Sequence, residues 1–435
     1  MKLISLSAIL ILFTFIVNAQ SYVVSPYSRY GLGELQTNSE PISFSMGGVT
    51  SAFRNTYSVN PYNPASFTSF LHDKDSIPMV FNGGFKGNYS MQENQNQSTK
   101  QFAGALNSMS FGFKAAKKWA MAFGLQPFSS VGYNIITSDK MDSINYKLKY
   151  EGTGGFNKFW LGNAVEFFNS LSLGFNVSYV FGSLNSIRRV VFDTVGYYNS
   201  KTIASRYVGD FAFDVGLQYN LLLKKDTTLN RNHTRLIIGF NSGLPRKMNA
   251  TQDLMAFRCY TVSGREYIMD TTGISNEIKG KVNLPLSISG GLMLVKDDRW
   301  SFGFDYKTQF WSEYESFGES DSLNNSTSIN FGFSYKPKNK QGVNYKKQPT
   351  WYGGLHYDKT YLTLRNNNLV KFGITFGCTF SLRPMFNRLE STVLTTGIEV
   401  GKMGTTDQNL IKENYVRFVI GVALKERWFS KKMYY

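Results

Sequence analysis

Residues 300–310 read Trp-Ser-Phe-Gly-Phe-Asp-Tyr-Lys-Thr-Gln-Phe, and this stretch decides the fold class of the chain. Apolar and polar side chains alternate along it, as they do in a β-strand whose two faces meet different surroundings. One face carries Trp300, Phe302, Phe304, Tyr306 and Phe310, and the other carries Ser301, Gly303, Asp305, Lys307 and Gln309. Because Asp305 and Lys307 would be costly in lipid, we expect their face to line a lumen and the aromatic face to contact acyl chains.

Three further segments repeat this alternation, at 171–181, 328–335 and 370–380. Three of the four segments keep the pattern for 11 residues, whereas strands of soluble proteins average about 5–6 residues. A soluble β-sandwich would also alternate, but the length of the segments and the Gly, Ser and Thr on their polar face favour a membrane barrel. The predicted fold is therefore all-β, a single closed antiparallel transmembrane barrel.

The same pattern, followed along the chain, predicts about fourteen strands, an even number as closure requires. They are expected near 77–91, 102–114, 118–136, 155–167, 170–185, 203–222, 232–243, 281–295, 299–312, 326–337, 349–362, 369–381, 391–403 and 415–429. Short connections at 115–118, 168–170 and 296–299 are assigned to the periplasmic side. Long connections at 184–202, 242–280, 312–327 and 403–414 are assigned to the exterior, and 336–349 is a longer periplasmic exception.

Four tryptophans support this layout. Trp119, Trp300 and Trp351 each open a strand that runs toward the exterior, and Trp428 closes the last strand. All four are expected at one rim, where an indole can bury its ring and keep its N–H hydrated, so they predict a periplasmic aromatic girdle.

The chain begins with an expected export signal over residues 1–19, with Lys2 before an apolar stretch and a small-residue cleavage site ending at Ala19. Residues 20–76 are too polar to span a membrane and too rich in Tyr, Met, Phe and Leu for a free tail. We expect this hatch segment to fold into the lumen as a plug, the alternative being a periplasmic tail. The barrel is assigned to 77–429 and a basic, aromatic tail to 430–435.

Composition narrows the possible functions. The formal charge is +17, but the basic residues lie in turns and at strand ends, and not on one stripe with stacking aromatics, so no nucleic-acid partner is predicted. Outer-membrane lipid and lipopolysaccharide are the expected surroundings. With three histidines and two cysteines, no metal, cofactor or catalytic residue is predicted. His356 is the sole plausible base among the histidines, and Cys378 is expected to face lipid.

The hatch segment holds the motifs Gly31-Leu32-Gly33, Met46-Gly47-Gly48 and Asn63-Pro64-Ala65. On these motifs and the count of fourteen strands, the chain resembles the FadL-type family of long-chain fatty acid transporters. The resemblance implies a hydrophobic small-molecule ligand, taken up past a hatch and released sideways through the wall beside a kinked third strand. Pro127 is the candidate for that kink, unless it is a harmless proline near the exterior strand end. No residue is identified as ligand-binding.

Three functions remain open. The first is uptake of a fatty-acid-like molecule by diffusion and lateral release. The second is a structural or accessory subunit that binds protein partners in an outer-membrane secretion or assembly complex. The third is a water-filled porin, which the hatch segment makes less favourable.

Overall fold

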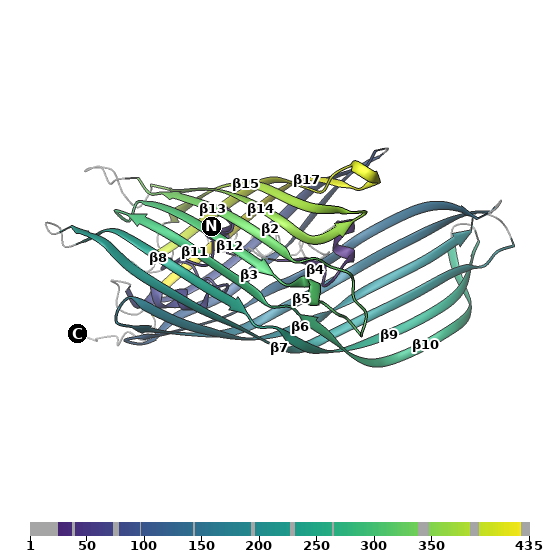
Figure 1. The fold of residues 1–435 in the computed structure, drawn as a ribbon, viewed down its shortest axis with the longest axis horizontal. Coiled ribbons are helices and arrows are strands. Elements are labelled where there is room, and N and C mark those ends of the chain that lie inside the picture. The colour runs from purple at the N-terminus through teal and green to yellow at the C-terminus, as the bar shows by residue number, and fades with distance from the viewer. Residues whose placement is uncertain are drawn as a thin grey trace, which may run out of the picture.

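The chain folds into a closed antiparallel β-barrel, shown from the side in Figure 1. The computed structural model describes residues 25–36, 40–72, 78–95, 97–141, 144–192, 196–226, 231–262, 265–337, 348–382 and 391–427. The expected export signal, Trp428 and the C-terminal tail lie outside the described residues. Within them, every helix is too short or too polar to cross a membrane.

Fourteen strands form the wall, so the predicted strand number is confirmed. They are β2 (Pro78–Glu93), β3 (Ser98–Ala116), β4 (Trp119–Met141), β5 (Ile144–Phe167), β6 (Leu171–Phe192), β7 (Asn199–Asp226), β8 (Arg231–Gly243), β11 (Ser287–Lys296), β12 (Trp300–Gln309), β13 (Ser326–Tyr335), β14 (Thr350–Leu364), β15 (Asn367–Leu382), β16 (Ser391–Met403) and β17 (Lys412–Arg427). The ring closes where β17 pairs with β2 over the whole length of both strands.

The prediction of a long loop at 242–280 is wrong. Two long strands, β9 (Arg246–Val262) and β10 (Arg265–Leu284), form a hairpin there. Because β8 pairs directly with β11, this hairpin stands outside the ring. Strand β9 pairs instead with the extracellular part of β7, from Asn199↔Cys259 to Val208↔Ala250.

The expected loop at 184–202 is also mostly strand, because β6 and β7 stay paired as far as Val190↔Ser200. The extracellular parts of β5, β6 and β7 therefore join β9 and β10 in one sheet beyond the barrel. We call residues 144–153, 185–192, 199–208, 246–262 and 265–284 the extracellular sheet, after the side on which the predicted layout of the strands places them; it extends to the right in Figure 1.

The two faces of the wall match the predicted alternation. Phe302 and Phe304 are 52% and 37% exposed on the outside of the barrel, where they are available to lipid. Asp305 is 1% exposed and accepts hydrogen bonds from the backbone N–H groups of Thr50 and Ser51, at 2.6 and 2.7 Å. The aromatic row therefore faces lipid and the charged row faces the lumen, because only the lumen offers partners to a carboxylate.

The described part of the hatch segment, residues 25–36 and 40–72, lies inside the barrel. It contains the 3₁₀ helix η1 (Pro26–Arg29), the short strand β1 (Glu34–Leu35), the helix α2 (Pro41–Ser45) and the 3₁₀ helix η2 (Pro64–His72). Proline opens α2, and the Glu40 side chain caps it by accepting from the N–H of Ser43 at 2.6 Å.

Glycines on the lumen face of the wall make room for this segment. A Cβ atom at Gly354 would lie 2.2 Å from the backbone nitrogen of Gly47, and one at Gly174 would lie 2.5 Å from that of Ala65. The wall strands therefore lack side chains where the hatch backbone approaches them.

The extracellular end of the lumen is closed by an apolar cluster. Leu32 of the hatch segment packs there against Trp311, Leu323 and Leu369, which are 1%, 6% and 0% exposed. Trp311 also packs against Tyr361, with ring centroids 4.8 Å apart and the rings tilted by 34°. The cluster joins the hatch segment to loops and strand ends from several parts of the wall.

Candidate functional site: a plugged gap in the wall and a charged lumen

The wall separates between β3 and β4. These strands pair from Ala116↔Trp119 to Met109↔Leu125, and in the described residues their pairing ends there. Strand β4 remains paired with β5 as far as Met141, while residues 98–108 of β3 remain paired with β2. The gap therefore lies in the extracellular half of the wall.

Pro127 stands at the point of separation, two residues after Leu125. Its ring nitrogen cannot donate a hydrogen bond, and the register with β5 shifts between Pro127 and Ser129. Pro127 therefore lies in the third strand of the wall, at an irregularity of the β4–β5 pairing. Its role in a wall opening stays a prediction.

The hatch segment supplies β4 with the partner that β3 no longer provides. In β1, Glu34 pairs with Ser130 and Leu35 with Ser129. The N–H of Gln36 donates to the carbonyl of Phe128 at 3.0 Å, and the N–H of Ser25 donates to the carbonyl of Gly132 at 2.8 Å. Residues 25–36 therefore satisfy backbone groups that would otherwise be open to lipid.

The motif Gly31-Leu32-Gly33 fits the hatch segment to this edge. Gly33 has a φ of +88°, in the left-handed region, and a Cβ atom there would lie 2.7 Å from the carbonyl oxygen of Ser130. The N–H of Gly31 donates to Asp321 at 2.8 Å, and Leu32 enters the apolar cluster.

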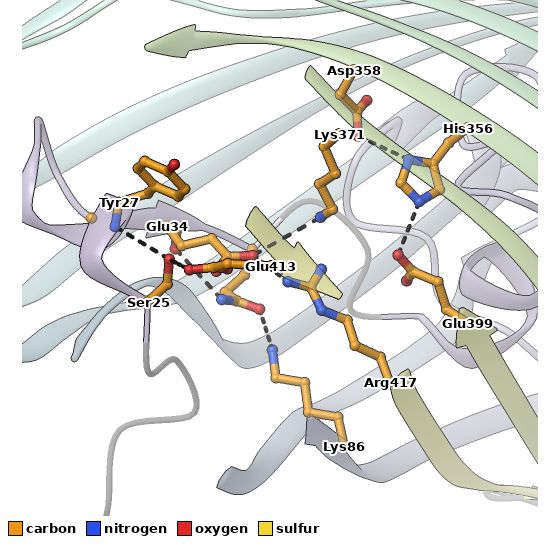
Figure 2. A network of polar contacts seen from close by, with 12 residues as sticks. Ser25, Tyr27, Glu34, Lys86, His356, Asp358, Lys371, Glu399, Glu413 and Arg417 are labelled. Atoms are coloured by element: carbon orange, nitrogen blue, oxygen red, sulfur yellow. Dashed lines mark hydrogen bonds and ion pairs between the residues drawn. The ribbon is translucent and has the colours of Figure 1, made fainter. Parts of the chain in front are cut away.

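Charged side chains of the wall hold the hatch segment at Glu34. Glu34 accepts a hydrogen bond from Arg417 of β17 at 2.6 Å, and the ammonium group of Lys371 lies 3.9 Å away. Figure 2 shows these side chains converging on Glu34, with Lys86 donating to Gln36 nearby. Burial favours the neutral carboxyl, but Arg417 and Lys371 outweigh it and hold the pKa of Glu34 below its usual range.

A second carboxylate group surrounds His356 on β14. Its Nδ1 lies 2.9 Å from Asp358 and its Nε2 lies 2.9 Å from Glu399 (Figure 2). Because carboxylates only accept, both ring nitrogens must donate, and His356 has no lone pair left for a base. His356, the sole plausible base among the histidines, is thus engaged in a structural network.

One cavity of the lumen is small and charged. It has a volume of about 70 Å³ and lies between the hatch segment and the wall. Its lining includes Glu34, Lys86, Asp305, Lys307, His356 and Arg417. Such a lining suits water or ions, whereas sites for hydrophobic ligands are mostly apolar and typically about 300–1,000 Å³.

The motif Asn63-Pro64-Ala65 docks on the part of the wall formed by β6, β7 and β8. The Asn63 amide donates to the carbonyl of Ser51 at 2.6 Å, and it lies 3.3 Å from that of Phe240. Its oxygen accepts from the N–H of Ala65 at 3.1 Å. The motif therefore anchors the hatch segment, and Phe67 just after it stacks on the buried Trp160 with centroids 5.8 Å apart.

The tryptophans occupy the expected positions along the strands. Trp119 and Trp300 open β4 and β12, and Trp351 is the second residue of β14. Trp119 and Trp351 are 41% and 38% exposed, and the Trp119 indole donates to Asn163 at 3.2 Å. Their role as an interfacial girdle stays a prediction.

Sequence reasoning missed the residues that lock the plug. Glu34, Lys371 and Arg417 lie far apart along the chain, and each is an ordinary charged residue in its own segment. The polar phase of β15 and β17 places Lys371 and Arg417 in the lumen, which was the available clue. The cysteines Cys259 and Cys378 are both free, and Cys378 is half-buried beside Thr396.

Known proteins share this architecture. The CymD monoaromatic hydrocarbon channel superposes with a TM-score of 0.55 at 13% identity, over 92% of this chain and 100% of that chain. The toluene transporter TodX of Pseudomonas putida gives 0.55 at 15% identity, over 92% and 100%. A FadL homologue of Pseudomonas aeruginosa gives 0.55 at 10% identity, over 90% and 99%. These solved relatives are channels and transporters, and at such identities the likeness establishes the fold.

No curated protein sequence matches the chain. A family model described as BamG matches residues 1–435. The protein is thus an outer-membrane β-barrel with the fold of FadL-type channels, and it belongs to the BamG family.

Proposed function

We propose that this protein is a structural subunit of an outer-membrane assembly or secretion complex. One observation carries the proposal: the described hatch segment occupies the lumen, and the cavity between it and the wall is small and charged. The apolar cluster around Leu32 and Trp311 closes the extracellular end as well. A barrel with a filled lumen can provide a complex with binding surfaces in the membrane and outside the cell, but not with a passage for molecules.

Purification from native outer membranes tests this function. The tagged full-length chain, extracted in mild detergent, is expected to run as a stoichiometric complex with other outer-membrane proteins in native mass spectrometry. Recovery of the chain by itself, with a lipid-like molecule in the solvent extract, would overturn the proposal. An unrelated outer-membrane barrel with the same tag serves as the control for chance association.

A second function, uptake of a hydrophobic small molecule, is favoured by a different observation. The gap between β3 and β4 is filled by two paired residues of β1, not by a wall strand. Movement of residues 25–36 would open a lateral exit beside Pro127, through which an apolar molecule could enter the bilayer. The hydrocarbon channels of similar fold lend support to this alternative.

A cross-link separates the two functions. Leu35 and Ser129 face each other in register, so the pair Leu35→Cys and Ser129→Cys, with Cys259→Ser and Cys378→Ser, should lock β1 to the wall. If the protein is a channel, uptake of a fluorescent fatty acid stops on oxidation and returns on reduction. If it is a structural subunit, the locked variant still joins its complex, and uptake equals that of cells lacking the protein. The single variant Ser129→Cys is the matched control.

A further inference from the structure

The extracellular sheet has an inner face that continues the face of the lumen. Arg29 of the hatch segment lies over the ring of Tyr150, with 4.2 Å from the guanidinium carbon to the ring centroid. Arg188 of β6 is directly opposite Tyr150 in the register, so it shares this face. The same row crosses β7 at Thr202 and reaches β9 at Ala256.

Aromatic side chains gather on this inner face near the tip of the sheet. Tyr260 of β9 stacks on Tyr267 of β10, with centroids 5.5 Å apart, and both are more than 40% exposed. Tyr198 is 50% exposed and lies under Arg258, at 5.9 Å from its guanidinium carbon. Large aromatic groups exposed together above a membrane mark a contact surface.

Positive charge accompanies these rings. Arg188 and Arg258 are exposed, and among the described side chains neither has an acidic group within salt-bridge distance. Asp270 stands opposite Arg258 in the register but does not pair with it there. Asp139 is a second acidic residue on this face, and its carboxylate accepts a hydrogen bond from the hydroxyl of Tyr146 at 3.1 Å.

Two basic residues on the outer face of the same sheet have acidic partners. Arg189 lies 2.6 Å from Glu151 and 3.6 Å from Glu266. Lys201 lies 3.2 Å from Glu266. Among the described residues, Arg188 and Arg258 of the inner face therefore differ from the arginine of the outer face, which is held by two carboxylates.

We propose that the inner face of the extracellular sheet docks an acidic segment of a partner polypeptide; the inference rests on the proposed role as a complex subunit. Tyrosine and arginine are the residues enriched in protein interfaces and in their energetic centres. Arginine fixes a carboxylate through two parallel hydrogen bonds, and the exposed rings cover apolar side chains beside it. The positive face selects acidic partners and repels basic ones.

Photo-crosslinking in native membranes tests the contact directly. A benzophenone amino acid is placed in the full-length chain at Tyr260 on the inner face or, as the control, at Lys149 on the outer face. We expect a protease-sensitive adduct from position 260 alone, whose partner peptide, identified by mass spectrometry, carries net negative charge. A protease-resistant adduct would indicate a surface glycan instead and would overturn the proposal, as would equal adducts from both positions.

Charge reversal supplies a second measurement. The variant Arg188→Glu/Arg258→Glu should lower the yield of this adduct at least tenfold. The variant Lys149→Glu/Lys279→Glu has the same change in net charge but reverses lysines of the outer face, and it should leave the yield within twofold. Folding of each variant is checked by heat-modifiable migration in gels, and Tyr198→Ser/Tyr260→Ser replaces the arginine variant if that one fails to fold.

The two proposals can fail separately. If the chain co-purifies in a stoichiometric complex but the arginine variant remains in it undiminished, the subunit role stands and the docking face is wrong. If the native chain is recovered without partners, the subunit role itself fails and the docking inference falls with it.

Discussion

Glu34 and Arg417 lie 383 residues apart in the chain, and their side chains meet at 2.6 Å inside the barrel. One belongs to the plug and the other to the last strand of the wall. Both are largely buried, at 22% and 13% side-chain exposure. The contact therefore ties the start of the described chain to its end, and it provides the first test of how the plug is held.

Replacing Arg417 with Gln should destabilise the folded barrel by about 2–4 kcal/mol, because Glu34 would remain buried without its charge-assisted hydrogen bond. The measurement is the temperature at which the protein loses its fast-migrating form in gels. The double variant Glu34→Gln/Arg417→Gln should recover part of the loss, since it removes both charges of the pair. Arg235→Gln breaks an exposed pair with Asp298, and it should change stability by less than about 1 kcal/mol.

Acid should loosen the plug only well below neutrality. The pKa of Glu34 is lowered in the folded protein, so its contribution is fully present above its ordinary value of 4.5 and is lost as pH falls through the lowered value. Melting temperatures of the native chain and of Glu34→Gln should therefore still differ at pH 5 and converge at lower pH.

The comparison with Glu34→Gln also removes the effect of Glu40, which has the opposite sign. Burial raises the pKa of Glu40, so its folded form gains stability as pH falls. A difference between the two proteins that already disappears between pH 7 and pH 5 would contradict the assigned ion pair.

Two adjacent glycines of β14 should respond differently to the same change. Gly354→Ala places a Cβ atom 2.2 Å from the backbone of Gly47, whereas the nearest atom to a Cβ at Gly353 is 3.9 Å away. We expect Gly354→Ala to cost about 1–3 kcal/mol by overpacking and to raise proteolysis within the hatch segment. Gly353→Ala should behave as the native chain does. Equal behaviour of both variants would mean that the plug does not dock on β14.

The lipid-facing row can be tested with a charge. Phe304→Arg should destabilise the barrel by about 2–4 kcal/mol if the residue lies near the bilayer midplane. Tyr197→Arg, at a position 49% exposed on the extracellular loop between β6 and β7, should have little effect. Unfolding by denaturant in lipid vesicles provides the comparison, and equal stability of both variants would contradict the assigned orientation of β12.

The wall could be predicted from sequence because its rule is local: in β12 and β16, alternate residues face lipid and must be apolar. The β9–β10 hairpin escaped prediction because that rule does not apply outside the bilayer. Its register shifts at three places, between Ile268 and Asp270, Thr271 and Gly273, and Ser275 and Ile278. Each shift interrupts the alternation that identifies a strand.

The candidate site was less accessible to sequence reasoning. Pro127 could be found because any proline lacks a backbone N–H and therefore interrupts the hydrogen bonding of a strand. The partners of Glu34 could not, because nothing in residues 30–36 indicates which lumen-facing cations of β15 and β17 will lie beside them. The hatch motifs were visible, while the wall glycines that receive them became meaningful only in three dimensions.

Strand β17, which closes the barrel, also contacts the hatch segment inside it. On one edge, β17 pairs with β2; on its inner face, Arg417 binds Glu34, and Gly421 leaves room for Pro41. The seam of the barrel and the seat of the hatch segment are therefore parts of the same strand. A change that shifts β17 along β2 would move Arg417 and Gly421 away from the hatch residues that they contact.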